Sequence, residues 1–500
     1  MVELKETTLE SVIYERGWDT SLTFHKEERL EWEKLDRYAT DFVRDIEDVD
    51  NVLVLYDVDV DGLFSGYFME NYLRTLGKNV VQDMNENKEH GLSDIQRVLN
   101  KIRENNVGLV VIPDAGTNDT EQLNMIKDLG VKTYVLDHHE IEVDLVEDEY
   151  IKILNVSEDS RLPKISGAGV TYRFIEKLNE VFNKPIEQYE NLVGITVLSD
   201  VCDMTEPENR YYVQRLYETC ESVPFFKCFD FYGSYSSLIS FKVVPFLNAL
   251  IRTGKTDLAM KIVNNMWKER VLRSIVKPHI YSVKEEQKNM VDELLTQGKV
   301  LKLDGMTVHI RKGLENREVN GLLANKLLGK YNQSCMVVGI NPDDMSVKGS
   351  FRGLNVDYDI LKRYGFECMG HPNACGISIN KEGFFNFKEN FEVRQSELRD
   401  KTLKSIDVTC LVDDIKESNI ELRRIALFNE YTGNNVIPIR IKLNDFRFVT
   451  VEEINKPNFS EFYIEGVRVV DFNNIESDNM VVEPVYDVTR GGYQLIRVDC

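Results

Sequence analysis

Acidic and imidazole side chains follow three short apolar runs of this sequence, and a fourth acid lies farther along the chain. The first run is followed by DVDVDG (57–62), the second by Asp114, the third by DHH (137–139), and ITVLSDVCDM supplies Asp200. Carboxylates that gather in one place repel one another unless cations neutralise them. Several carboxylate oxygens with an imidazole nitrogen suit Mn²⁺ or Mg²⁺, whereas zinc more often recruits sulfur or more imidazoles. If these segments meet, we expect a site for two divalent cations.

Such a pair of cations would be suited to the hydrolysis of phosphate esters. Two ions held about 3.5–4 Å apart can lower the pKa of a water molecule and neutralise charge on a phosphoryl group under in-line attack. The spacing of the acidic residues therefore favours phosphoester hydrolysis.

Each motif, taken alone, has an ordinary structural interpretation. A DxDxDG segment is often a calcium loop or a capped turn, but the EF-hand loop has a Glu six residues after its Gly, where this chain has Phe68. A lone Asp at a strand end, such as Asp114, usually caps a helix, and a pair of His in a loop is usually structural. Because all four motifs occur at the expected ends of successive elements, the functional interpretation is favoured over these alternatives.

The apolar runs predict the sheet that would bring the motifs together. Continuous apolar residues at 51–56, 107–113 and 132–136 are typical of buried parallel strands, and helical patterns at 64–76 and 93–104 separate them. This alternation predicts a doubly wound α/β domain, whose ligands bind at the carboxyl ends of the strands.

The rest of the chain predicts three further regions. Residues 251–298 are charged and poor in glycine, which indicates a long connecting helix interrupted near Pro278. A second, smaller α/β pattern occupies 299–395, and the strand-like segments of 396–500 indicate a C-terminal β domain.

Composition limits the class of protein. The 500 residues exceed one ordinary hydrophobic core, and 61 basic against 84 acidic side chains give a net charge of −23. Bulk electrostatics therefore cannot attract a polyanion, which must be held by local basic groups or by bound metal. The eight cysteines form no CxxC pair, and neither a signal peptide nor an apolar membrane span is evident. We expect a soluble, cytoplasmic protein in a reducing compartment, without membrane contact.

The four motifs resemble those of the DHH phosphoesterase superfamily, which is named for the triplet found here at 137–139. Further segments are similar to RecJ-type single-strand exonucleases, in the same order along the chain. They are SGAGVTYRF (166–174), LSDVCDMTEPENR (198–210), PFLNALIR (245–252), VNGLLANKLLGKY (319–331), GSFRG (349–353) and MGHPNACG (369–376). The resemblance assigns 1–250 to a DHH domain, 251–298 to the connecting helix, 299–395 to a DHH-associated substrate-binding domain and 396–500 to an OB-like β domain.

The resemblance also implies roles for individual residues. Asp114 would bridge two Mn²⁺ or Mg²⁺ ions, and Asp137 would orient the neighbouring imidazole or backbone. His139 would contact the leaving group or the scissile phosphate, while Asn248 and Arg252 would stabilise the phosphoryl charge. The full set of expected cation ligands is Asp57, Asp59, Asp61, Asp114, His138 and Asp200.

The second domain would hold the remainder of a nucleic-acid strand. Ser350 and Arg352 of GSFRG can donate to a phosphate, and Gly370, His371 and Gly376 resemble a backbone nest for a phosphate or terminal nucleotide. A cleft between the two domains would admit one strand and exclude a duplex.

Several residues depart from the family pattern. Phe246 stands where the family has arginine, Met369 replaces a glycine and Cys375 replaces an alanine. The loss of the arginine removes a phosphate contact and bears on substrate affinity more than on metal binding. The C-terminal region would contact nucleic acid or dock a replication or repair protein.

The resemblance implies a Mn²⁺- or Mg²⁺-dependent single-strand DNA exonuclease that works from 5′ to 3′ and releases 5′-mononucleotides. One alternative is a phosphodiesterase of short oligoribonucleotides or cyclic dinucleotides from the same superfamily. The other is a DHH scaffold of a replication complex without catalysis, which the complete set of Asp and His residues disfavours.

Overall fold

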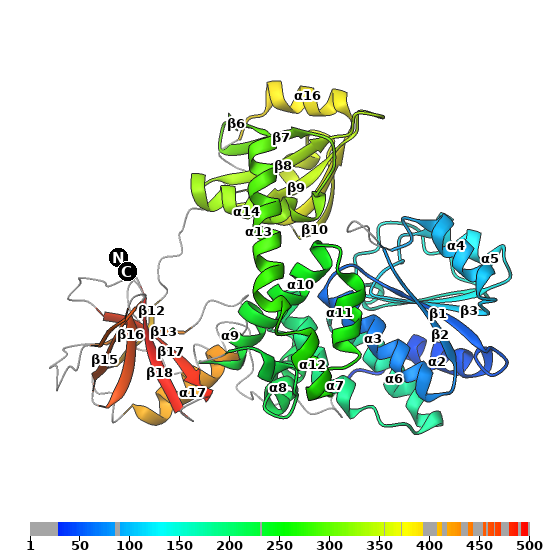
Figure 1. Cartoon of the computed structure of the whole chain (residues 1–500), viewed down its shortest axis with the longest axis horizontal. Coiled ribbons are helices and arrows are strands. Elements are labelled where there is room, and N and C mark those ends of the chain that lie inside the picture. The colour runs from blue at the N-terminus through cyan, green and yellow to red at the C-terminus, as the bar shows by residue number, and fades with distance from the viewer. Residues whose placement is uncertain are drawn as a thin grey trace.

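The computed structural model of the chain contains three bodies, which Figure 1 shows as a right-hand, an upper and a left-hand group of elements. The described residues are 29–85, 91–230, 233–354, 356–371, 373–393, 408–412, 418–431, 439–443, 454–456, 459–464, 466–471, 480–488 and 492–498. Among these residues, every helix is too short or too polar to cross a bilayer.

The first body is built on a five-stranded parallel sheet with the order β2-β1-β3-β4-β5. Val52 and Val54 face one side of the sheet, and Leu53 and Leu55 face the other, because successive side chains of a strand alternate. Both sides are covered by helices, as the apolar runs predicted. The strands are β1 (Asn51–Tyr56), β2 (Asn79–Met84), β3 (Leu109–Pro113), β4 (Lys132–Asp137) and β5 (Ile151–Asn155).

Helices cover the sheet and extend the first body beyond it. Those that follow the strands or cover their faces are α2 (Glu33–Asp45), α3 (Val60–Thr75), α4 (Ile95–Glu104), α5 (Thr120–Lys127) and α6 (Gly167–Phe182), with the 3₁₀ turn η2 (Val156–Glu158) after β5. The remainder are α7 (Glu187–Ser199), α8 (Pro207–Thr219), η3 (Phe226–Cys228), α9 (Tyr235–Leu238), the π-helical turn η4 (Ile239–Val243), α10 (Val244–Arg252), α11 (Thr256–Val263) and α12 (Glu269–Ile275).

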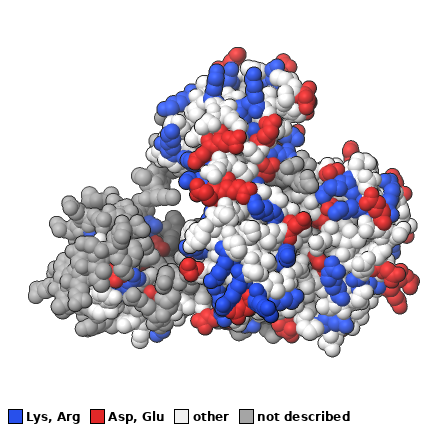
Figure 2. Space-filling model, viewed as in Figure 1, with Lys and Arg blue, Asp and Glu red and all other residues white. Residues whose placement is uncertain are grey.

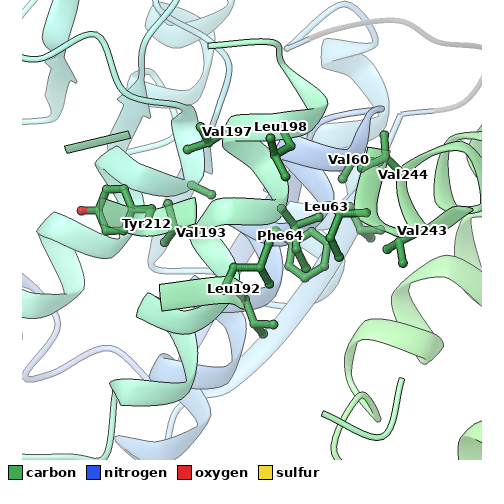
Figure 3. Close-up of a cluster of buried hydrophobic side chains, with 14 of the residues drawn as sticks. Val60, Leu63, Phe64, Leu192, Val193, Val197, Leu198, Tyr212, Val243 and Val244 are labelled. Carbon is green, nitrogen blue, oxygen red and sulfur yellow. The ribbon is translucent and has the colours of Figure 1, made fainter. Parts of the chain in front are cut away.

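A buried apolar cluster joins the helices that carry the predicted chemistry. Phe64 of α3 packs among side chains of α7 and of the η4–α10 joint, including Leu192 and Val244 (Figure 3). Tyr212 of α8 belongs to the same core. The cluster therefore fixes α3, α7 and α10 relative to one another.

The segment expected to form a connecting helix interrupted near Pro278, over 251–298, contains α11, α12 and α13 (His279–Gln297). Gly254 adopts a left-handed conformation with φ +70°, and α11 and α12 return to the first body, where Met260 and Leu272 are buried. Only α13, which begins directly after Pro278, rises to the second body (Figure 1). The long connecting helix is thus confirmed as α13, with its interruption at Pro278, while α11 and α12 belong to the first body because their apolar residues are buried in its core.

The second body is a six-stranded sheet with the order β10-β11-β9-β8-β7-β6, in which only β7 and β8 are parallel. Helix α14 packs on one face, and the apolar cluster beneath α15 and α16 covers the other. Its elements are β6 (Lys299–Leu303), β7 (Met306–Lys312), η5 (Arg317–Val319), α14 (Asn320–Tyr331), β8 (Ser334–Ile340), β9 (Val347–Arg352), α15 (Asp359–Lys362), β10 (Glu367–His371), β11 (Ala374–Ile379) and α16 (Lys381–Asn390).

The described part of the third body is a seven-stranded sheet with the order β12-β13-β17-β18-β16-β15-β14 and one helix, α17. Helix α17 packs against β17 and meets the first body, where Tyr431 stacks on Tyr217 with ring centroids 5.8 Å apart. The C-terminal β region is thus present, and its assignment as OB-like stays a prediction. Its elements are β12 (Val408–Val412), α17 (Asn419–Tyr431), β13 (Arg440–Leu443), β14 (Ile454–Lys456), β15 (Phe459–Ile464), β16 (Val467–Asp471), β17 (Met480–Asp487) and β18 (Gly492–Val498).

Charge is mixed on the surface of the molecule. Figure 2 shows acidic and basic side chains interspersed over the visible face of the first and second bodies. Because the net charge is −23 and the surface charges are mixed, any nucleic acid must be bound by local groups.

Candidate functional site

The four predicted motifs meet at one edge of the first sheet. Asp57 follows β1, Asp114 follows β3 and Asp137 ends β4, and these three strands are neighbours in the sheet. Asp200 reaches the same edge from the C-terminal end of α7. The carboxyl ends of parallel strands form the usual ligand-binding edge of such folds.

His138 lies at the centre of the carboxylates. Its Nε2 atom is 3.1 Å from Asp114 Oδ1, 3.5 Å from Asp200 Oδ2 and 3.6 Å from Asp61 Oδ2. Three carboxylates from three separate segments therefore surround one imidazole nitrogen.

The ligand atoms fall into overlapping groups of three, within each of which they lie within 4.8 Å of one another. One group draws on the first motif and the second, a further one on the first, third and fourth, and the last on the second and third. Asp114 and His138 each belong to two of the groups, and Asp114 is the carboxylate among them that two cations could share. The groups are Asp57, Asp59 and Asp114; Asp61, His138 and Asp200; and Asp114, His138 and His139.

The start of α3 fixes the first motif. Asp59 is the N-cap of α3, and its Oδ1 accepts a hydrogen bond of 3.0 Å from the Gly62 amide. The buried Asp61 carboxylate accepts hydrogen bonds from the backbone amides of Gly167 and Ala168, at 2.7 and 2.9 Å. The first turn of α6 thus orients a ligand from α3, a contact that the residue types did not predict.

Asp114 is held in a strained conformation. Its φ is +66°, in the left-handed region that non-glycine residues seldom adopt, and such strain is typical of functional sites. Gly167 makes room for it, because a Cβ atom on Gly167 would lie 2.2 Å from Asp114 Oδ1. Both carboxylate oxygens are buried, and neither accepts a hydrogen bond from the part of the chain that the structure describes.

These donors fit Mn²⁺ or Mg²⁺. Buried carboxylate oxygens without hydrogen bonds are costly unless a cation compensates them. The set is rich in oxygen, contains imidazole nitrogen, and includes no thiolate among the grouped ligands.

The Asp137 carboxylate holds the DHH turn through contacts with its neighbours. Its Oδ1 accepts from the His138 amide at 2.7 Å and lies 2.8 Å from His139 Nδ1, and its Oδ2 accepts from Thr117 Oγ1 at 2.6 Å. Burial alone would raise the pKa of Asp137, but His139 and these hydrogen bonds bring it below its ordinary value. Burial opposes the charge of His139, yet Asp137 outweighs it and raises the pKa of His139 to about 10.

Two polar residues that the sequence did not single out hold the same turn. Asn155, at the end of β5, donates to Thr117 Oγ1 and to the His139 carbonyl, both at 2.9 Å. Ser157 donates to the His138 carbonyl at 2.9 Å. With its backbone held in this way, His139 presents a half-exposed imidazole toward the site.

Burial and mutual repulsion raise the pKa values of three of the clustered carboxylates. Burial and then the nearby Asp59 raise the pKa of Asp61 from 3.8 to about 6. Burial and the neighbouring aspartates also raise the pKa values of Asp114 and Asp200 well above the ordinary range. Without a cation, these carboxylates therefore take up protons at higher pH than ordinary aspartates do.

We expect Mn²⁺ affinity to fall as the pH is lowered through about 6. A cation binds the ionised carboxylates, so at pH values below the raised pKa of Asp61 it must displace a proton, and affinity should drop about tenfold or more for each pH unit. Without cation, the raised pKa means that the folded chain loses stability as the pH rises from 3.8 to about 6, and Mn²⁺ should restore it. Calorimetric titration with Mn²⁺ between about pH 5 and 7.5 checks this; equal affinity across the range would contradict it.

The predicted phosphate-binding residues approach the acidic cluster from two bodies. Arg252 ends α10, with Asn248 one turn earlier, and both are half-buried. Burial and the nearby Arg352 lower the pKa of Arg252, while Asp59 opposes this shift. Arg252 of the first body thus lies near both Asp59 and Arg352, which belongs to the second body.

The other predicted residues of the second body lie on neighbouring strands. Ser350 of β9 is paired with Gly376 of β11, and Gly370 and His371 lie on the edge strand β10. The guanidinium of Arg352 packs against Gly321 at the start of α14, where a Cβ atom would lie 2.5 Å from Nη2. The five residues predicted to hold the strand therefore occupy one end of this sheet.

Comparison with known proteins agrees with this architecture. Residues 51–197 match the DHH family, N-terminal domain. The chain is 25% identical, over 89% of its length and 85% of the relative's, to the SPbeta prophage-derived protein YorK of Bacillus subtilis, which is named as a single-strand DNA-specific exonuclease. It is 23% identical to the single-stranded-DNA-specific exonuclease RecJ of the same species, over 84% of this chain and 56% of that protein.

A solved structure shares the fold over nearly the whole chain. RecJ from Thermus thermophilus in complex with Mn²⁺ superposes with a TM-score of 0.72 and 17% identity, covering 97% of this chain and 74% of that one. The arrangement of the three bodies is therefore a known one.

Proposed function

We propose that this chain, a DHH-superfamily protein similar to RecJ, is a Mn²⁺- or Mg²⁺-dependent exonuclease of single-stranded DNA. In this proposal it works from 5′ to 3′ and releases 5′-mononucleotides. The observation that carries the proposal is the convergence of Asp61, Asp114 and Asp200 on His138, with Arg252 near enough for the charge of Asp59 to act on it. The names of the relatives that align along most of the chain support single-stranded DNA as the substrate.

Two bound cations would supply an activated water and neutralise charge on the phosphoryl group. Asp57, Asp59, Asp61, Asp114, His138 and Asp200 would hold them, with Asp114 shared.

The surrounding residues would bind and orient the substrate. Asp137 fixes the His139 ring, so that the protonated imidazole can contact the scissile phosphate or donate a proton to the leaving oxygen. Arg252, with Asn248 beside it, would contact the phosphoryl oxygens. Arg352, Ser350 and the β10–β11 backbone would hold the neighbouring phosphate, which places one end of the strand between the two bodies.

A product ladder tests this function. Purified protein with Mn²⁺ should shorten a long 5′-phosphorylated single strand one nucleotide at a time, and a 5′ label should appear at once as a mononucleotide. A 3′ label should instead remain on a descending ladder. Consumption of di- to pentanucleotides alone would favour a phosphodiesterase of short oligonucleotides, and no hydrolysis of any strand would favour a scaffold.

Replacing Arg352 by alanine should weaken binding of the single strand and leave metal content unchanged. The loss of one phosphate contact should lower affinity about tenfold and reduce the slope of log affinity against log salt by about 0.7. Fluorescence anisotropy at several salt concentrations and metal analysis measure the two effects. Lys388→Ala, on α16 at the far end of the second body (Figure 1), is the matched control and should change neither. Loss of metal in R352A would contradict the proposed division of roles between the bodies.

A further inference from the structure

Two cysteines of the second body lie side by side on neighbouring strands. Cys368 is on the edge strand β10 and Cys375 is on β11; the antiparallel register pairs Cys368 with Ile377 and Gly370 with Cys375. The cysteines are therefore diagonal neighbours on the same face of the sheet, where side chains are within reach of each other. Each thiol is close enough to shift the pKa of the other.

The surroundings shift the pKa values of the two thiols in opposite directions. The Cys375 thiol lowers the pKa of Cys368, burial opposes the shift, and Lys362 of α15 adds to it. The Cys368 thiol and burial raise the pKa of Cys375. Cys368 is half-buried and Cys375 is buried. The pair thus combines a half-buried thiol of lowered pKa with a buried thiol of raised pKa, the arrangement of a reactive cysteine with a resolving partner.

The pair is also close to residues expected to bind the strand. Gly370 and His371 follow Cys368 on β10, and Gly376 follows Cys375 on β11. The backbone register places Cys375 opposite Phe351 of β9, so the thiols occupy the face opposite to Arg352. A bond between the sulfurs would therefore not cover the face of the sheet that carries Arg352. It would act on the strand-binding residues by shifting the backbone.

We propose that Cys368 and Cys375 form a redox-active dithiol, which a peroxide closes to a disulfide and a small thiol reopens, and that closure weakens binding of single-stranded DNA. The chemistry of the pair is independent of the proposed function, whereas its effect on strand binding rests on that function.

The reaction balances with hydrogen peroxide as oxidant. The Cys368 thiolate attacks the peroxide, a sulfur–oxygen bond forms, the oxygen–oxygen bond breaks, and the hydroxide released takes up a proton to become water. The Cys375 sulfur then attacks the Cys368 sulfenic acid; the sulfur–sulfur bond forms, and the departing hydroxide leaves as water with the Cys375 proton. Two thiols and one peroxide thus yield one disulfide and two waters.

The cross-link should be easy to reduce. Diagonal positions on antiparallel strands are farther apart than a relaxed disulfide requires, so closure must pull β10 along β11. Strained disulfides have higher reduction potentials and are the labile ones. Among the described strands, the edge strand β10 pairs with β11 alone, so fewer backbone hydrogen bonds oppose such a shift than for a central strand.

Tryptic peptide mass spectrometry of the full-length protein tests the dithiol directly. Trypsin releases 364–381 with both cysteines and no others, so a disulfide lowers the mass of this peptide by two hydrogens and prevents alkylation. After brief peroxide treatment of the native protein, we expect that mass loss, its reversal by dithiothreitol, and its absence in C368S and C375A. Cys335→Ala, on β8 of the same sheet, is the control and should leave the closure unchanged. Two alkylated cysteines in peroxide-treated 364–381, or a sulfinic acid on Cys368 instead of a disulfide, would overturn the proposal.

The effect of the disulfide on strand binding is measured separately. Anisotropy with a single strand should show about fivefold weaker binding after peroxide, roughly the loss of one hydrogen bond, and full recovery with dithiothreitol. C375A should bind the single strand as the reduced chain does, and peroxide should not change its affinity. A closed disulfide with unchanged affinity would refute the link to strand binding, while failure to bind any single strand in either state would instead refute the proposed function.

Discussion

Replacing Asp114 by asparagine is expected to lower turnover of a single strand about a thousandfold, which corresponds to about 4 kcal/mol of activation free energy. Asparagine is the informative substitution because it keeps the side-chain volume and, like aspartate, tolerates the left-handed backbone that Asp114 adopts with φ +66°. It removes the negative charge of the carboxylate that two groups of donor atoms share. Activity measured at saturating Mn²⁺ checks the effect.

The same variant should be more stable than the parent when cations are removed. Burial, and then repulsion from Asp61, Asp59 and Asp200, raise the pKa of Asp114, so the amide relieves a burial cost and a repulsion that oppose folding. Thermal unfolding in chelator should show a higher midpoint, by about 2–4 °C for each kcal/mol relieved. Asp128→Asn, at the exposed end of α5, is the control and should change neither property. Unaltered turnover in D114N would refute the shared-ligand role.

Substituting Gly167 by alanine should reduce activity about a hundredfold without altering any ligand. The added Cβ atom would lie 2.2 Å from Asp114 Oδ1 and 2.6 Å from Asp114 Cγ, so the carboxylate must move. A displacement of about 1 Å at a reacting centre can cost this much. Mn²⁺ titration should show weaker binding to G167A, because Asp61 also accepts a hydrogen bond from the Gly167 amide.

A neighbouring glycine on α6 provides the matched control. The three atoms nearest to a Cβ atom on Gly169 would be side-chain atoms of Ile165, at 3.1–3.4 Å. Gly169→Ala should therefore fold, bind Mn²⁺ and turn over substrate much as the parent does. Equal activity in G167A and G169A, with both folded by circular dichroism, would contradict the close packing proposed around Asp114.

The central sheet and the meeting of its motifs were predictable from the sequence because buried parallel strands carry their own pattern. β1, β3 and β4 are continuous apolar runs, and polar ligands follow them directly. β2 was not predicted, since NVVQDM is an edge strand with exposed positions and two polar residues near its end. β5 was missed for a similar reason, because IKILN is short and contains a lysine.

The contacts that complete the site were not predictable from residue types. The amides of Gly167 and Ala168 orient Asp61, and any residue can offer a backbone amide. The positive φ of Asp114 and the proximity of Arg252 to Arg352 arise only when separate segments pack together. The extent of the connecting helix was not predictable either, because local helix propensity did not indicate that α11 and α12 fold back onto the first core.

The most direct test is anomalous diffraction from crystals of the full chain grown with excess Mn²⁺. We expect two anomalous peaks about 3.5–4 Å apart at the carboxyl edge of the first sheet, with Asp114 between them and His138 bound to one. Two ions in that position would establish the binuclear centre on which the proposed hydrolysis depends. Peaks confined to the molecular surface, with Asp61, Asp114 and Asp200 still clustered around His138, would contradict it.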